Sequence, residues 1–111
     1  DGHIGCLANL ASLHWRRGDR ALARSTQQQA VERATRLLPR EHFVVSVSMT
    51  NLAWMACELG ELDTAIPLLR EALSRSEAAG RAGEAAMQRA RLAELLARQQ
   101  RAAGGVDDSG R

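Results

Sequence analysis

The residues of this chain best suited to metal or thiol chemistry are few and scattered. The chain has three histidines and two cysteines: His3, His14, His42, Cys6 and Cys57. The cysteines form no CxxC pair, and the histidines do not cluster at the spacing that zinc ligands require. We therefore expect no metal site and no cofactor. His14 is expected in the core or at a helix interface, and the cysteines are expected as buried, reduced thiols within helical segments.

Three acidic residues, Glu58, Glu61 and Asp63, form a cluster around Gly60. Acids just before or inside the first turn of a helix stabilise its dipole, which accounts for this cluster without any catalytic role. The sequence contains no nucleophile elbow, no phosphate-binding loop and no HExxH pattern. These observations predict no catalytic residue and a protein that is not an enzyme.

The charge pattern argues against a nucleic-acid partner, and the hydropathy pattern argues against a membrane span. All 15 basic residues are arginine, the net charge is only +2, and acids and bases are interleaved. A helical DNA-binding domain remains a remote alternative because the last helix carries several arginines: Arg81, Arg89, Arg91, Arg98 and Arg101. The absence of an apolar run of about 18 residues and of a signal-peptide pattern leads us to expect a cytoplasmic protein.

The elements that must position any site are helices. Apolar residues recur at steps of three and four, the period of one helix face, and alanine is abundant. This spacing predicts an all-α chain with helices at about 3–17, 20–38, 41–59, 62–78 and 84–102. The apolar stripe of the third helix is expected to include Phe43 and Val47, and that of the fifth helix to include Ala86, Ala90, Leu92 and Ala93. Gly18 and Gly60 are expected to end the first and third helices, because glycine tolerates the left-handed conformation of a helix cap. The segment 104–111 has no apolar face and is expected to be disordered.

A repeat of 42 residues organises these helices. Shifting the chain by 42 aligns Asn9-Leu10-Ala11 with Asn51-Leu52-Ala53, and it aligns Gly18 with Gly60. Further matches pair Ala23 with Ala65, Ala30 with Ala72, and Arg33 with Arg75. A period of this kind indicates stacked helical hairpins, in which large residues fill the gap between paired helices and alanines let them approach closely.

The second unit, from Asn51-Leu52-Ala53 to Gly60-Glu61-Leu62 and on to Ala72-Leu73, resembles the tetratricopeptide repeat family. The 42-residue spacing resembles the kinesin-light-chain type, which also occurs in bacterial regulators. The resemblance implies a right-handed superhelix of antiparallel helix hairpins within residues 1–103, with repeats at about 3–39 and 41–80. The helix at 84–102 would be either the first helix of a third repeat or a helix that caps the stack.

The same resemblance implies where a partner would bind. In this family, the first helix of each hairpin lines a concave groove that binds a peptide or protein segment. Transferred by position, the groove of this chain would present nine residues: Asn9, Ser12, Arg16, Asn51, Trp54, Glu58, Arg91, Glu94 and Arg98. The alternative interpretation is that the asparagines only tie helices together and that Trp54 packs half-buried. Ala8 and Thr50 stand where a carboxylate clamp would have lysine, which argues against recognition of an acidic carboxyl terminus.

The resemblance implies a protein-interaction module that is part of a larger regulator or scaffold. The alternative is a structural segment that self-associates without a peptide ligand. About three repeats are the usual minimum for a stable solenoid, and this chain has about two and a half. We therefore expect its apolar ends to be covered, either by a second copy in a homo-oligomer or by flanking repeats.

Overall fold

The computed structural model describes residues 2–109, with side chains described for 4–103; Asp1 and the last two residues of the predicted tail lie outside this range. Its five helices are α1 (Gly2–Arg16), α2 (Arg20–Leu37), α3 (Phe43–Glu58), α4 (Leu62–Ala78) and α5 (Ala82–Ser109). No strand occurs within the described range. The prediction of an all-α chain is confirmed, and the first four helices lie within two residues of their expected bounds.

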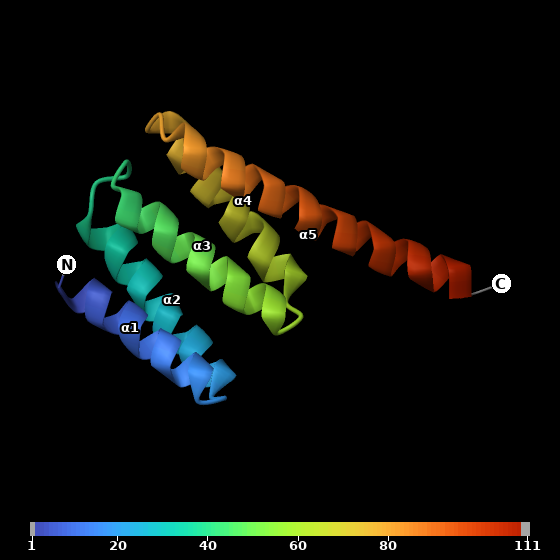
Figure 1. Cartoon of the computed structure of the whole chain (residues 1–111), viewed down its shortest axis with the longest axis horizontal. Coiled ribbons are helices and arrows are strands. Elements are labelled where there is room, and N and C mark those ends of the chain that lie inside the picture. Colours follow the sequence, from blue (N-terminus) through green and yellow to red (C-terminus); the bar gives the residue numbers. More distant parts are fainter. Residues whose placement is uncertain (1, 110–111) are drawn as a thin grey trace.

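The helices form two antiparallel hairpins, α1–α2 and α3–α4, followed by the single helix α5. Each helix packs against the next one along the chain. Figure 1 shows α1, α3 and α5 on the nearer face, with α2 and α4 behind them. The first helices of successive units therefore share one face of the molecule, as stacked helical hairpins require.

The reversals inside the hairpins depend on glycine. Gly18 and Gly60 have φ values of 91° and 81°, the left-handed conformation that other residues adopt only with strain. A Cβ at either position would meet no atom within 4 Å, so only the backbone conformation demands glycine there. Because the two glycines are 42 residues apart, the period of the sequence is also the period of the turns.

Small residues bring the paired helices together, as predicted. Ala11 of α1 and Ala23 of α2 are fully buried in one cluster. Their repeat equivalents Ala53 and Ala65 are buried in another. Alanine has no side chain beyond Cβ, so the two helix axes of each hairpin can approach closely.

Repeat-equivalent leucines have different surroundings. Leu52 is 1% exposed and packs in a cluster with Val31 and Ala34 of the preceding hairpin, whereas Leu10 is 43% exposed. The prediction that both leucines fill a helix interface is therefore wrong for Leu10. The reason is that Leu10 faces outward from the first hairpin, where no earlier helix lies among the described residues.

Helix α5 is longer than predicted, and it is rotated relative to the predicted face. Leu92 is buried as expected, but Ala86, Ala90 and Ala93 are exposed. The buried residues of α5 are Ala85, Gln88, Leu92 and Leu95. Alanine is compatible with either side of a helix, so its spacing did not identify the face that meets α4.

The backbone of 104–109 continues α5 as a helix, and the expected disorder of the tail stays a prediction. Figure 1 shows this end of α5 extending beyond the α3–α4 hairpin. Adding a residue to an existing helix fixes few dihedrals for each hydrogen bond gained, so a helix can continue past its packed region.

Candidate functional site

The exposed face of α3 carries a stripe of five residues at helical spacing. Phe43, Val47, Asn51, Trp54 and Glu58 follow one another at steps of four, four, three and four, and all are exposed. The sequence predicted that Phe43 and Val47 point inward, and the structure corrects this. Three of the five side chains are large and apolar, so this stripe is a candidate contact surface for another protein.

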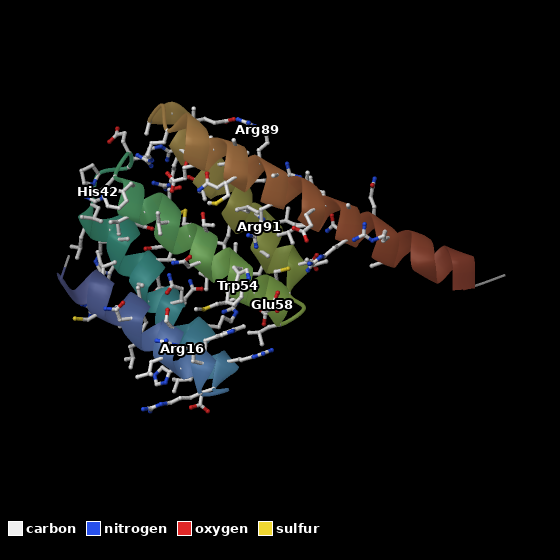
Figure 2. The ribbon with its side chains drawn as sticks, in the orientation of Figure 1. Arg16, His42, Trp54, Glu58, Arg89 and Arg91 are labelled. Carbon is white, nitrogen blue, oxygen red and sulfur yellow. The ribbon has the colours of Figure 1, made fainter. Side chains whose placement is uncertain are left out.

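A pocket of about 300 Å³ lies between α3 and α5, and we call it the groove pocket. Its lining residues are Thr50, Asn51, Ala53, Trp54, Cys57, Glu58, Leu69, Met87, Arg91, Glu94, Leu95 and Arg98. Figure 2 shows Trp54, Glu58 and Arg91 close together in this region. The six predicted site residues from α3 and α5 all line this one pocket.

A second hollow, the tryptophan pocket, lies between α1 and α3. It is lined by Ser12, Trp15, Arg16, Trp54 and Met55. The rings of Trp15 and Trp54 pack with their centroids 4.9 Å apart. Trp54 also lines the groove pocket, so the two pockets are neighbours. The predicted residues Ser12 and Arg16 therefore lie on the same face of the molecule as the groove pocket.

The third hollow, the amino-terminal pocket, holds about 260 Å³ and was not predicted. Its lining residues are Ile4, Gly5, Ala8, Leu38, His42, Phe43, Val44, Val47, Ser48 and Asn51. His42 begins α3, its Nδ1 accepts a hydrogen bond from the Val44 N–H at 3.1 Å, and its ring stacks on Phe43. The spacing of Phe43, Val47 and Asn51 along one face of α3 is the signal that could have revealed this pocket.

The three pockets are neighbours on the α1–α3–α5 face, because they share lining residues on α3. Asn51 lines both the amino-terminal pocket and the groove pocket, and Trp54 lines both the groove pocket and the tryptophan pocket. Asn9, the remaining predicted residue, is exposed on α1 and lines none of these three pockets.

Charged groups around the groove pocket divide into paired and available ones. Arg98 is held by Glu94, with 3.1 Å between Nη2 and Oε2, and its Nη1 donates to the Cys57 sulfur at 3.1 Å. Within the side chains described, the structure shows no ion pair for Glu58 or Arg91. One acid and one base therefore face the pocket with their charges available to a partner.

A buried polar network holds α5 against the second hairpin. The side-chain N–H₂ of Gln88 donates to Ser46 Oγ at 2.9 Å and to Thr50 Oγ1 at 3.0 Å. The hydroxyls of Ser46 and Ser76 lie 2.8 Å apart. Ser46, Ser76 and Gln88 are completely buried and belong to α3, α4 and α5 respectively. The network thus sets the position of the wall of the groove pocket that α5 supplies.

No group of three or more metal-ligating side chains that could hold an ion is found within the described range. No helix of that range is both long enough and apolar enough to span a membrane. Of the two cysteines that were expected to be buried, Cys6 is exposed and Cys57 is half-buried.

Stacked helical hairpins define a helical-repeat protein. The tetratricopeptide repeat family model matches residues 3–78, which is most of the chain. The chain belongs to the tetratricopeptide repeat family, whose members generally mediate contacts between proteins and are typically not catalytic. A comparison with curated proteins gives no match.

Proposed function

We propose that this chain is a protein-interaction module whose α1–α3–α5 face binds a segment of a partner protein. The observation that carries the proposal is the presence of three neighbouring pockets on this face, with Asn51 and Trp54 each lining two of them. An exposed tryptophan flanked by apolar hollows is the kind of anchor that dominates protein interfaces. The groove residues lie on neighbouring helices of a rigid stack, so the surface is formed before a partner binds.

The pairing of arginines near α5 supports a protein partner over a nucleic acid. Arg81 pairs with Glu84, Arg89 with Glu77, and Arg98 with Glu94. Binding to phosphates requires a surface of uncompensated positive charge. These acids reduce the positive potential along the face that a DNA-binding helix would use.

We also propose that the module is of the 42-residue type found in kinesin light chains and bacterial regulators, and that it works in the cytoplasm within a larger regulator or scaffold. The 42-residue separation of the turn glycines Gly18 and Gly60 supports the repeat type. An interaction module of this size would supply the binding surface, and other domains of the regulator would produce the response to binding.

The groove is tested by comparing proteins captured by the wild type with those captured by an Asn51→Ala, Trp54→Ala double variant. We expect the captured proteins to fall by at least about 10-fold, because loss of a central aromatic anchor costs about 2 kcal/mol or more. Quantitative mass spectrometry of the eluates makes the measurement, and circular dichroism verifies that both proteins are helical.

The matched control replaces two exposed leucines on α2, Leu22→Ala and Leu37→Ala, which line none of the three pockets. The control variant should capture the same proteins as the wild type. An unchanged set of captured proteins with the folded Asn51/Trp54 variant would show that the groove is not the binding site.

Self-association is the second candidate function, and the exposed leucines of the first hairpin favour it. Leu10 and Leu13 occupy the positions of Leu52 and Met55, which are buried against the preceding hairpin. This outer face of α1 is therefore built like an interface but has no helix on it among the described residues.

If a second copy covers this face, sedimentation velocity should show a dimer whose fraction rises with protein concentration. A Leu10→Glu, Leu13→Glu variant should then be monomeric, since burying two carboxylates in an apolar interface is costly. The groove variant Asn51→Ala serves as the control and should dimerise normally. A wild type that stays monomeric at high concentration rejects self-association and leaves the peptide-binding proposal intact.

A further inference from the structure

We propose that docking of α5 on the second hairpin is a conformational switch that forms the groove pocket and the amino-terminal pocket together. Two residues at the start of this helix, Arg81 and Gln88, fasten it to the start of α3 and to the loop before α3. The switch goes beyond the proposed function, because it determines when the surface is formed rather than what binds there, and it operates without a partner.

The loop of residues 38–42, which joins the two hairpins, is held by the start of α5. Arg81, the residue before this helix, donates from Nη1 to the backbone oxygen of Glu41 at 2.8 Å. Its Nε–H donates to Glu84 Oε1 at 2.7 Å, and Glu84 belongs to the first turn of α5. A guanidinium fixed by an ion pair presents its remaining N–H groups in one direction. Figure 1 shows the loop and the start of α5 at the same end of the molecule, so the position of the loop depends on where α5 begins.

Gln88 makes a second connection, two turns further along α5. Its side-chain N–H₂ donates to Ser46 Oγ at 2.9 Å and to Thr50 Oγ1 at 3.0 Å, and both acceptors lie in the first half of α3. Gln88 and Ser46 are completely buried, so water does not compete for the hydrogen bond between them. The first turns of α5 are thus joined by side chains to the segment from Glu41 to Thr50.

The same loop and the first turn of α3 form one wall of the amino-terminal pocket. Four of the residues that line this pocket belong to the wall: Leu38, His42, Phe43 and Val44. A second arginine, Arg75 of α4, also donates to the loop, with a longer distance of 3.4 Å between its Nη1 and the Arg40 oxygen. Undocking of α5 would therefore remove the shorter of these two hydrogen bonds to the loop backbone.

Docking of α5 also supplies one wall of the groove pocket. The residues of this wall are Met87, Arg91, Glu94, Leu95 and Arg98. Within the described range, α4 is the one helix against which α5 packs extensively, whereas α2, α3 and α4 each pack against two helices. A helix with a single packed neighbour opens at a lower free energy than the rest of a fold. Docked and undocked α5 are therefore the two states of the switch.

The two pockets should consequently respond to one another. Both are complete only when α5 is docked, although α5 itself lines only the groove pocket. A ligand in either pocket stabilises the docked state, so it should raise the affinity of the other pocket by the same factor in both directions. Arg81 lines neither pocket, so its removal changes the switch without changing the surface of either pocket.

The test is residue-resolved amide hydrogen exchange, measured by nuclear magnetic resonance on the full chain with Arg81→Ala. Three amides report on the loop wall, and none of them donates to α5. The His42 N–H donates to Pro39 O at 3.0 Å, and the N–H groups of Val44 and Val45 donate to the Nδ1 and O atoms of His42. We expect all three to exchange at least about 5-fold faster, since a charge-assisted hydrogen bond to the loop is lost. Exchange in the first turns of α5 should rise as well, because its undocking is the same event.

Arg89→Ala is the matched control. Arg89 lies on the same helix and pairs with Glu77 of α4 at 3.1 Å, and no hydrogen bond joins it to the loop among the side chains described. This variant should leave the loop amides as they are in the wild type. A second variant, Glu84→Gln, keeps Arg81 and removes the charge that orients it, so it should accelerate the same amides by a smaller factor. Circular dichroism verifies that each variant is helical.

Faster exchange of the loop amides with no change in α5 would overturn the switch, because Arg81 would then anchor only the loop. Acceleration by the same factor throughout, including the amides of Ala23 and Ala30 in the first hairpin, would also overturn it, since global unfolding would then account for the exchange. Unchanged loop amides in both Arg81→Ala and Glu84→Gln would reject control of the wall by α5. Each of these results leaves the capture experiment for the groove unaffected.

Discussion

Replacing Leu52 with alanine should lower the free energy of unfolding by about 2–5 kcal/mol, the range seen when a fully buried leucine is truncated. Leu52 is 1% exposed and packs against both its own hairpin and the preceding one, in a cluster with Val31, Ala34, Val45 and Met49. The substitution removes apolar contacts with α2 and leaves a cavity between the two repeats. Urea denaturation followed by far-ultraviolet circular dichroism measures the change.

The same chain offers its own matched control at the preceding repeat. Leu10 is aligned with Leu52 but is 43% exposed, so Leu10→Ala should cost only about 1 kcal/mol or less. A loss for Leu10→Ala as large as that for Leu52→Ala would contradict the exposed position of Leu10. It would mean that a second copy covers Leu10 in solution, which a dependence of stability on protein concentration would reveal.

The second large effect is expected at Gln88, whose side chain is completely buried between α3 and α5. Gln88→Ala should destabilise the protein by about 2–4 kcal/mol, since it removes buried volume and two hydrogen bonds at once. The loss should concentrate in α5, because α5 packs on α4 and has no following helix within the described range. Amide hydrogen exchange should therefore increase more in α5 than in α3.

Gln88→Met separates packing from hydrogen bonding in this network. Methionine fills a similar volume, and Ser46 and Thr50 each retain another hydrogen-bond acceptor without the glutamine, at Ala72 O and Ser46 O respectively. The Gln88 Oε1 atom is buried and has no partner among the described residues, so its removal costs nothing in hydrogen bonding. We expect Gln88→Met to lie within about 1 kcal/mol of the wild type. Equal losses for methionine and alanine would show that the hydrogen bonds, and not the packing, hold α5.

Much of the groove pocket followed from the resemblance to the repeat family. The resemblance predicted that six residues lie on one face, and the structure places all six around a single pocket. They are Asn51, Trp54 and Glu58 on α3 and Arg91, Glu94 and Arg98 on α5. The amino-terminal pocket was missed because Phe43 and Val47 were interpreted as core residues. An exposed apolar side chain and a buried one look alike in sequence when both fall at helical spacing.

The polar residue Gln27 shows how a tertiary hydrogen bond allows a polar side chain at a position where an apolar one is expected. Gln27 stands where the repeat family usually has a large apolar residue, and its repeat equivalent is Leu69. Both side chains are buried, and Gln27 donates from Nε2 to the backbone oxygen of Ser48 at 3.1 Å. The hydrogen bond across to α3 satisfies the buried amide, so a polar residue is accepted in a core position.

The sequence by itself determined the helices, their turns and the period. These are local properties, because they depend on residue spacing, on alanines small enough for close helix approach and on glycines at φ values near 81° and 91°. Only the tertiary structure decided which of two equivalent leucines is buried, which side of α5 meets α4, and where the pockets lie. Burial depends on whether a neighbouring helix is present at that place, and 42-residue periodicity makes Leu10 and Leu52 identical in pattern while only Leu52 has that neighbour.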